Sequence, residues 1–197
     1  MFSRPLCVAS IVLALTSGAS APAIAQDFQV KTATLANGLY VAVVEDHRAP
    51  VVTQMVYYRA GSADEMPNQR GVAHFLEHMM FQGTSTTPGA EFRATIARFG
   101  GRENAFTSSD VTAYHQTVGK EALELVMRLE ADRMHNLTIT QKEFNSEKEV
   151  IKEERRNRYE NEPQGLFAEQ FSAAMYLNHP YGNPVIGYMH EIDALTR

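Results

Sequence analysis

Two histidines and a glutamate lie close together in the segment from Arg70 to Phe81. On a helix, at about 100° per residue, His74, Glu77 and His78 fall within one narrow arc. Apolar side chains cover the other side of this helix. Two imidazoles one turn apart can share one metal ion, and the carboxylate between them lies beside it. This arrangement offers nitrogen ligands, an open coordination position and a base for a water molecule, which a hydrolytic zinc site needs.

The same His-x-x-Glu-His spacing is known in zinc peptidases as the inverse of His-Glu-x-x-His. A pattern of five residues can also arise from composition alone. The alternative interpretation is a solvated helix face or a structural pair of histidines. A third ligand elsewhere in the chain is therefore needed to decide between them.

The segment 140–159 is predicted to be a second helix, and it begins with a capping box. Glu147 and Glu154 fall on its apolar side, although ionised carboxylates are costly to bury unless they are paired or bound to a cation. Glu143 shares this arc, so periodicity leaves open which of the three glutamates completes a metal site. For residues 148–153, a solvated face with ion pairs is the better interpretation.

The chain of 197 residues, with 44% hydrophobic and 21% charged residues, has room for one substantial core. Its net charge of -5 gives no electrostatic reason to expect a nucleic-acid partner. No apolar run is long enough to span a membrane. We therefore expect a globular domain with neither kind of partner.

The first residues have the features of an export signal. A positive charge precedes the apolar segment Leu6 to Leu15, and Ala23-Ile24-Ala25 offers a small-x-small cleavage site. We therefore divide the chain into a signal peptide, residues 1–25, and a domain, residues 26–197, and expect a periplasmic or secreted protein. Cys7, the one cysteine, belongs to the signal, so the mature chain has no thiol nucleophile and no cysteine ligand.

Alternation, turn signals and helical periodicity predict the remaining elements. Strands are expected at 28–35, 39–45, 51–60, 102–107 and 111–118, and helices at 70–81, 90–99, 120–136, 140–159 and 165–177. This order predicts one α+β domain with a largely antiparallel sheet flanked by helices.

The chain resembles the pitrilysin family of zinc peptidases, which includes insulysin and the mitochondrial processing peptidase. The resemblance runs from about Leu35 to the end of the chain and rests on blocks that occur in the family's order. These blocks are His74–His78 with Glu154, residues 100–108 with 110–114, and residues 179–182.

The resemblance implies a role for each matching side chain. His74, His78 and Glu154 would be the ligands of one zinc ion. Glu77 would be the general base that takes a proton from the water that zinc activates. Glu147 would be the family's additional acidic residue, which supports the site without being a principal ligand.

Asn104 and Ala105 match the edge strand that aligns the peptide substrate, in agreement with the gain of main-chain hydrogen bonds when a peptide joins a sheet edge. The resemblance thus implies a zinc metalloendopeptidase that cleaves extended or unfolded peptides. Five other histidines match no role and are expected to be structural or at the surface: His47, His115, His135, His179 and His190.

Family members pair the zinc-bearing half with a second, similarly folded half, in one chain or as a partner subunit. The resemblance implies that this chain is an incomplete first half of such a clamshell, so the isolated chain is not expected to be an efficient peptidase. One alternative is a non-catalytic scaffold subunit of the same fold, although such relatives usually lose motif residues that are all present here. The other alternative is a structural zinc domain, which would require a fourth protein ligand.

Overall fold

The computed structural model describes residues 29–197, so the predicted signal peptide lies outside the described residues. The chain forms two units, which divide after Arg48. In the first unit, β1 (Val30–Thr34) and β2 (Tyr40–Val44) form an antiparallel hairpin. Gly38 takes a positive φ of 85° in its turn, as the Asn-Gly pair predicts.

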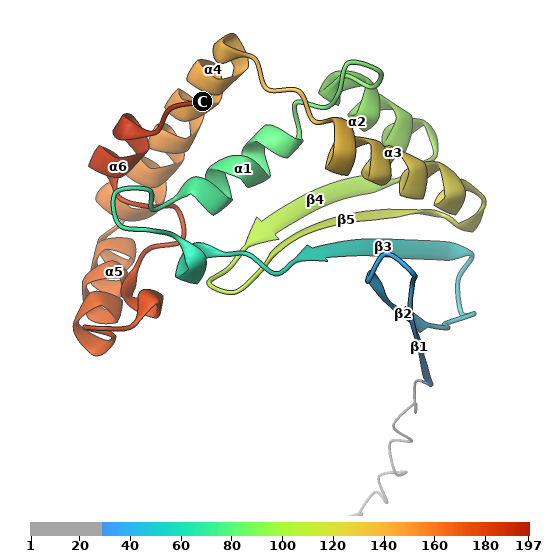
Figure 1. Cartoon of the computed structure of the whole chain (residues 1–197), viewed down its shortest axis with the longest axis horizontal. Coiled ribbons are helices and arrows are strands. Elements are labelled where there is room, and N and C mark those ends of the chain that lie inside the picture. The colour runs from blue at the N-terminus through green and yellow to red at the C-terminus, as the bar shows by residue number, and fades with distance from the viewer. Residues whose placement is uncertain (1–28) are drawn as a thin grey trace, which may run out of the picture. The chain divides into compact units, whose positions relative to one another are not determined.

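The second unit is built on a three-stranded sheet with the order β3-β5-β4, comprising β3 (Val51–Tyr58), β4 (Arg102–Thr107) and β5 (Thr112–Gly119). Both pairings are antiparallel, and β4 lies at one edge (Figure 1). This confirms the predicted α+β class with an antiparallel sheet.

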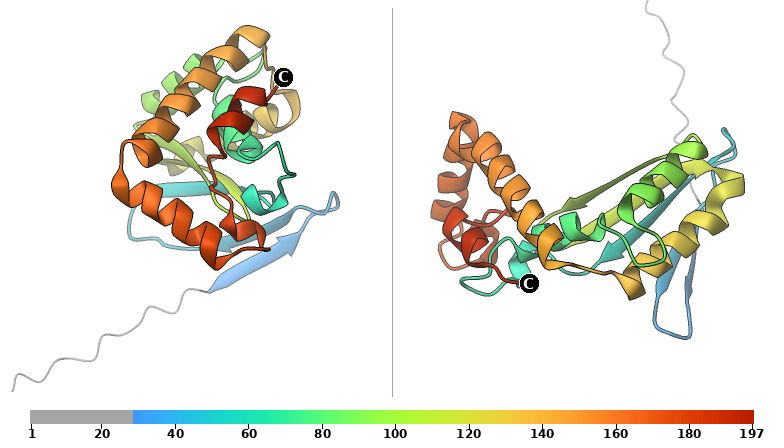
Figure 2. Two further views of the ribbon diagram at one scale, coloured as in Figure 1. Left: turned by 90° about the vertical axis from the view of Figure 1, so that its left-hand side faces the viewer. Right: turned by 90° about the horizontal axis from the view of Figure 1, so that it is seen from above.

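Helices make up the rest of this unit. They are α1 (Val72–Met80), α2 (Gly89–Arg98), α3 (Leu123–Asn136), α4 (Gln141–Arg155), α5 (Pro163–Met175) and α6 (Met189–Ala194), with short 3-10 turns at Ser62–Asp64, Lys120–Ala122 and Pro180–Gly182. Helices α1, α2 and α3 lie over one face of the sheet, while α4 packs against α1 and α6 (Figures 1 and 2). None of the described helices is long and apolar enough to cross a membrane.

The predicted helix at 140–159 contains an α-helix that ends at Arg155, after which the π-helical segment η3 (Arg156–Glu160) continues the chain. The N–H of Asn161 closes this wider turn on the carbonyl of Arg156 at 2.7 Å. Val150, which helical periodicity places near the apolar side of this helix, has a side chain that is 49% exposed. Periodicity gives the direction of a side chain but not the extent of the neighbour that covers it.

Two apolar clusters hold the second unit together. One joins α1 and α4 through Phe75, Met79, Phe144, Ile151, Ile186 and Ile192. Its Phe75 and Phe144 rings stack with centroids 4.6 Å apart. Each of these buried side chains contributes roughly 1.5–3 kcal/mol, so the two helices form a stable frame. The other cluster packs α2 and α3 on the sheet.

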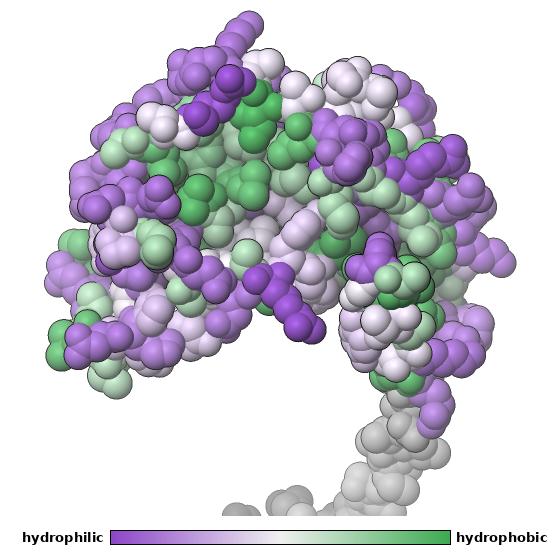
Figure 3. All heavy atoms as spheres, viewed as in Figure 1, coloured by the Kyte–Doolittle hydropathy of each residue, from purple (hydrophilic) through white to green (hydrophobic). Residues whose placement is uncertain are grey.

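Apolar surface also remains open on α1. Val72 and Leu76 are exposed, and the space-filling view shows an apolar area over this helix (Figure 3). The helix is therefore buried along the stripe that faces α4 and the sheet, and a second stripe with apolar side chains is exposed to solvent.

The start of α1 is fixed by two carboxylates. Glu65 accepts a hydrogen bond from the N–H of Gly71 at 2.7 Å. Glu191 accepts from the N–H groups of Asn68 and Arg70, each at 3.0 Å. Glu191 comes from α6, so this contact fixes the entry of α1 from more than a hundred residues away.

Gly71 precedes α1 with a φ of 93°, and a Cβ atom there would lie 2.5 Å from the carbonyl oxygen of Ile186. We expect Gly71→Ala to lower the free energy of unfolding by about 2–5 kcal/mol, combining left-handed strain with a backbone overlap. Gly100→Ala is the matched control, since Gly100 also has a positive φ but nothing within 4 Å of its Cβ position. Equal losses for the two variants in chemical denaturation would contradict the close approach at Gly71.

Candidate metal centre

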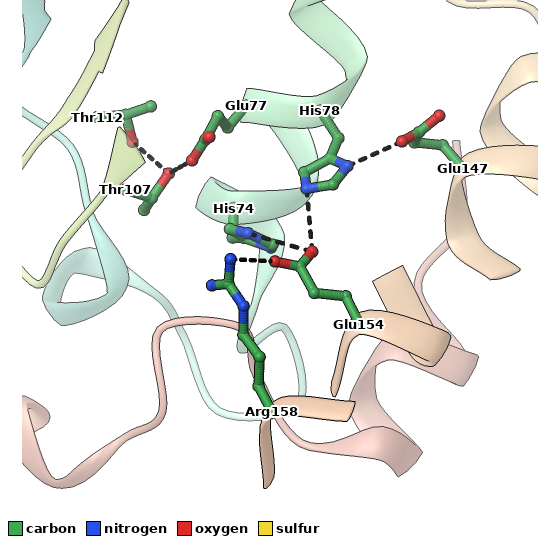
Figure 4. A network of polar contacts seen from close by, with 8 residues as sticks. All are labelled: His74, Glu77, His78, Thr107, Thr112, Glu147, Glu154 and Arg158. Atoms are coloured by element: carbon green, nitrogen blue, oxygen red, sulfur yellow. Dashed lines mark hydrogen bonds and ion pairs between the residues drawn. The ribbon is translucent and has the colours of Figure 1, made fainter. Parts of the chain in front are cut away.

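The structure brings the two histidines of α1 against a glutamate of α4. Glu154 Oε2 lies 3.3 Å from His78 Nε2 and 3.8 Å from His74 Nε2 (Figure 4). One ligand atom from each of the three residues lies within 4.8 Å of the others. Ligand atoms that share a tetrahedral zinc ion are separated by roughly 3.3–3.6 Å, given bonds of about 2.0–2.2 Å. The donor set of two imidazoles and one carboxylate therefore fits a zinc ion.

The three glutamates that periodicity left open have separate positions. Glu143 closes the capping box at the start of α4, where its carboxylate accepts from Thr140. Glu147 contacts the far side of one imidazole, and Glu154 alone of the three reaches both. The geometry thus favours Glu154 as the third ligand.

Glu147 orients His78. Its Oε1 accepts from His78 Nδ1 at 2.8 Å, and its Oε2 accepts from Gln82 at 3.1 Å. The bond at Nδ1 turns His78 Nε2 toward Glu154, as carboxylates next to metal-binding histidines commonly do. His74 differs, since its buried Nδ1 has no hydrogen-bond partner among the described residues.

Without a metal, the pKa values of the two imidazoles are shifted in opposite directions. Burial, together with the nearby His78, lowers the pKa of His74 to about 4. Burial alone would lower the pKa of His78 too, but hydrogen bonds to Glu147 and Glu154 raise it to about 9. His74 is therefore neutral and has a free lone pair. His78 is protonated between two carboxylates, and the negative charges of these carboxylates would equally balance a metal cation.

Glu77 lies beside this group but outside it. Its Oε2 accepts a hydrogen bond from Thr107 Oγ1, at the end of β4, at 2.5 Å. Burial raises the pKa of Glu77, and this hydrogen bond partly offsets the effect. Thr112 donates its own hydroxyl proton to the carbonyl of Ala60, so the Thr107 proton is left for Glu77.

A cavity of about 540 Å³ opens over these side chains. Asn104 and Ala105, on the edge strand β4, line the cavity. Arg158 and Tyr159, in η3, also line it. The edge strand and the metal-binding group thus share one space.

Three polar side chains at the site were missed by the sequence analysis: Gln82, Thr107 and Arg158. Thr107 lies within a block that matches the family, but nothing in that block relates it to Glu77. Arg158 follows Glu154 by four residues, a spacing that equally fits an ordinary surface ion pair.

An antiparallel sheet whose edge strand borders a His-His-Glu group, with the carboxylate of Glu77 beside it, is the arrangement expected of a zinc-peptidase type of domain. Residues 40–188 match the family model described as insulinase, peptidase family M16. The chain belongs to this family, which confirms the resemblance seen in the sequence.

Bacterial zinc proteases are similar to the chain. Zinc protease PqqE of Helicobacter pylori is 37% identical over 95% of the chain and 42% of that protein. The uncharacterized zinc protease YmxG of Bacillus subtilis is 35% identical over 80% of the chain and 38% of that protein. The chain thus spans about two fifths of the length of these relatives.

Solved structures give the same result. A protease from Helicobacter pylori matches with a TM-score of 0.82 and 36% identity, over 86% of the chain and 41% of that chain. The periplasmic protease PqqL from Escherichia coli matches with a TM-score of 0.78 and 30% identity, over 88% of the chain and 20% of that chain. The first half of PqqL, solved separately, matches with a TM-score of 0.74.

Proposed function

We propose that the chain is the zinc-binding part of a metalloendopeptidase that cleaves extended or unfolded peptides. The proposal rests chiefly on the convergence of His74 and His78 from α1 with Glu154 from α4, in a cavity that an edge strand also lines. Relatives named zinc proteases support it.

His74, His78 and Glu154 would hold the ion, and Glu147 would keep the His78 imidazole in the ligating orientation. When bound, zinc would act as a Lewis acid that polarises the scissile carbonyl and acidifies a water molecule. Three protein ligands are the usual number in a catalytic zinc site, where a fourth position stays open.

Glu77 would take the proton from the attacking water and later give it to the leaving amine. Its buried setting favours this role, because a carboxylate with a raised pKa is a better proton acceptor. Thr107 holds Oε2, which leaves Oε1 for the water.

The substrate would align along β4 through main-chain hydrogen bonds, with Asn104 and Ala105 at the point of contact. This mode demands an extended backbone and few particular side chains, which suits unfolded peptides. A second homologous half, fused or separate, would complete the enclosure. Residues 1–25 would direct the protein to the periplasm or the exterior.

The proposal is tested by cleavage of an unfolded protein such as reduced, alkylated casein. We expect the zinc-loaded chain to cleave it efficiently when a homologous second half is added, a chelator to abolish cleavage, and added zinc to restore it. Zinc binding without cleavage, also in the presence of a homologous second half, would favour the non-catalytic scaffold alternative. Failure to bind zinc would contradict the proposal itself.

The hydrogen bond from Thr107 gives a separate prediction. Thr107→Val removes the donor with little change in shape, and we expect kcat to fall about tenfold or more, because hydrogen bonds to charged groups contribute roughly 1.5–3 kcal/mol. Thr107→Ser keeps the hydroxyl and should retain most of the activity. Steady-state kinetics test this, and equal losses for both variants would mean that packing, not the hydroxyl, matters at this position.

A further inference from the structure

We propose that Arg158 is a positioning residue that holds one oxygen of Glu154 so that the other faces the two imidazoles. This inference rests on the zinc site proposed above and adds a residue to it. It concerns the affinity for the metal, so it is testable without a peptide substrate.

The two oxygens of Glu154 have different partners. Oε1 lies 2.9 Å from Arg158 Nη2, whereas Oε2 lies toward His74 and His78 (Figure 4). A guanidinium on Oε1 therefore fixes the rotation of the carboxylate and presents a single oxygen to the position between the imidazoles. Metal-ligating carboxylates commonly have such partners, and removing them typically costs about 10–100-fold in metal affinity.

The local fold places Arg158 in the π-helical segment η3, where α4 widens after Arg155. Both Arg158 and Tyr159 line the cavity that holds the site. Isolated π-helical turns occur frequently at functional sites, because they re-aim side chains relative to a regular helix. Here the wider turn begins two residues after Glu154 and contains the arginine that contacts its carboxylate.

The ordinary alternative is an exposed ion pair with no role at the site. The Arg158 side chain is 67% exposed, and exposed pairs add little to the stability of the fold. A positive charge would also repel a cation, although water screens this long-range effect more than it weakens a direct hydrogen bond. The two interpretations predict different changes in zinc affinity when Arg158 is removed. Only a positioning role predicts that zinc then binds less tightly.

The same stretch of chain offers a matched control. Arg156 forms an ion pair with Glu153 at 3.0 Å, and both of these side chains are exposed. Neither residue lines the cavity. Arg156→Met therefore removes an equivalent charge and ion pair two positions away, without touching Glu154.

The experiment measures the zinc dissociation constant of the full chain by competition with a chromogenic chelator. We expect Arg158→Met to raise it about 10–100-fold and Arg156→Met to leave it within twofold of the original. Arg158→Lys keeps a charged donor without the planar fork, so it should give an intermediate value. Circular dichroism checks that all variants are folded. If Arg158→Met is unfolded, the zinc affinity of Arg158→Lys is compared with that of Arg156→Met instead.

Cobalt substitution adds a spectroscopic test. We expect Arg158→Met to alter the visible absorption of the cobalt-loaded chain, because Glu154 is free to rotate, and Arg156→Met to leave it unchanged. An unchanged or tighter zinc affinity for Arg158→Met, or equal losses in the two methionine variants, would overturn the role of Arg158. Absence of zinc binding by the unmodified chain would instead overturn the proposed zinc site.

Discussion

Replacing Glu77 by Gln is expected to lower kcat/KM by about 10²–10⁴-fold, the range that general acid–base groups contribute. Gln is nearly isosteric and still accepts the hydrogen bond from Thr107 through its amide oxygen. It cannot take a proton from water, so only the chemical step should suffer. Hydrolysis of a fluorogenic peptide by the zinc-loaded protein, with a homologous second half added, measures the loss.

The zinc dissociation constant serves as the control for this variant. Glu77 lies outside the group formed by His74, His78 and Glu154, so Glu77→Gln should bind zinc within about threefold of the original affinity. Undiminished cleavage by this variant would contradict the role of Glu77 as the base. A loss of zinc together with activity would make Glu77 a ligand instead.

Zinc affinity should fall in a graded way across three glutamates of one helix. Removing the carboxylate ligand with Glu154→Gln should raise the zinc dissociation constant about 10²–10³-fold, because roughly 10–16 kcal/mol of binding is shared among four ligands in comparable sites. Glu147→Gln disturbs only the orientation of His78, and about 10–100-fold is expected.

Glu143→Gln is the matched control in this series. Its carboxylate closes the capping box at the start of α4 and contacts Thr140. Gln can also close a capping box but has no charge, so this change should reduce helix stability by only about 0.3–1 kcal/mol and leave zinc affinity unchanged. Isothermal titration with zinc and chemical denaturation separate the two effects. A reversed order for Glu147 and Glu154 would assign the third ligand to Glu147.

The sequence predicts those features that depend on neighbouring residues. The Asn37-Gly38 turn, the capping box at Thr140 and the arc shared by His74 and His78 are local, and the structure confirms each of them. The order of elements was sufficient to predict an antiparallel sheet with helices on it.

What the sequence could not predict depends on contacts between distant segments. Glu191 reaches Arg70 across 121 positions, and Thr107 reaches Glu77 from another element. Neither pair has a periodic pattern that would reveal it. The choice among the glutamates of α4 is of the same kind, because helical periodicity gave them one face and the packing against α1 separated them.

In the proposed site, the two neighbouring helices α1 and α4 bring three side chains to one zinc ion. Anomalous diffraction at the zinc absorption edge, from crystals of the zinc-loaded protein, tests it directly. We expect one peak within about 2.0–2.2 Å of His74 Nε2, His78 Nε2 and Glu154 Oε2. A peak bound by other residues, or a zinc ion from which Glu154 points away, would contradict it.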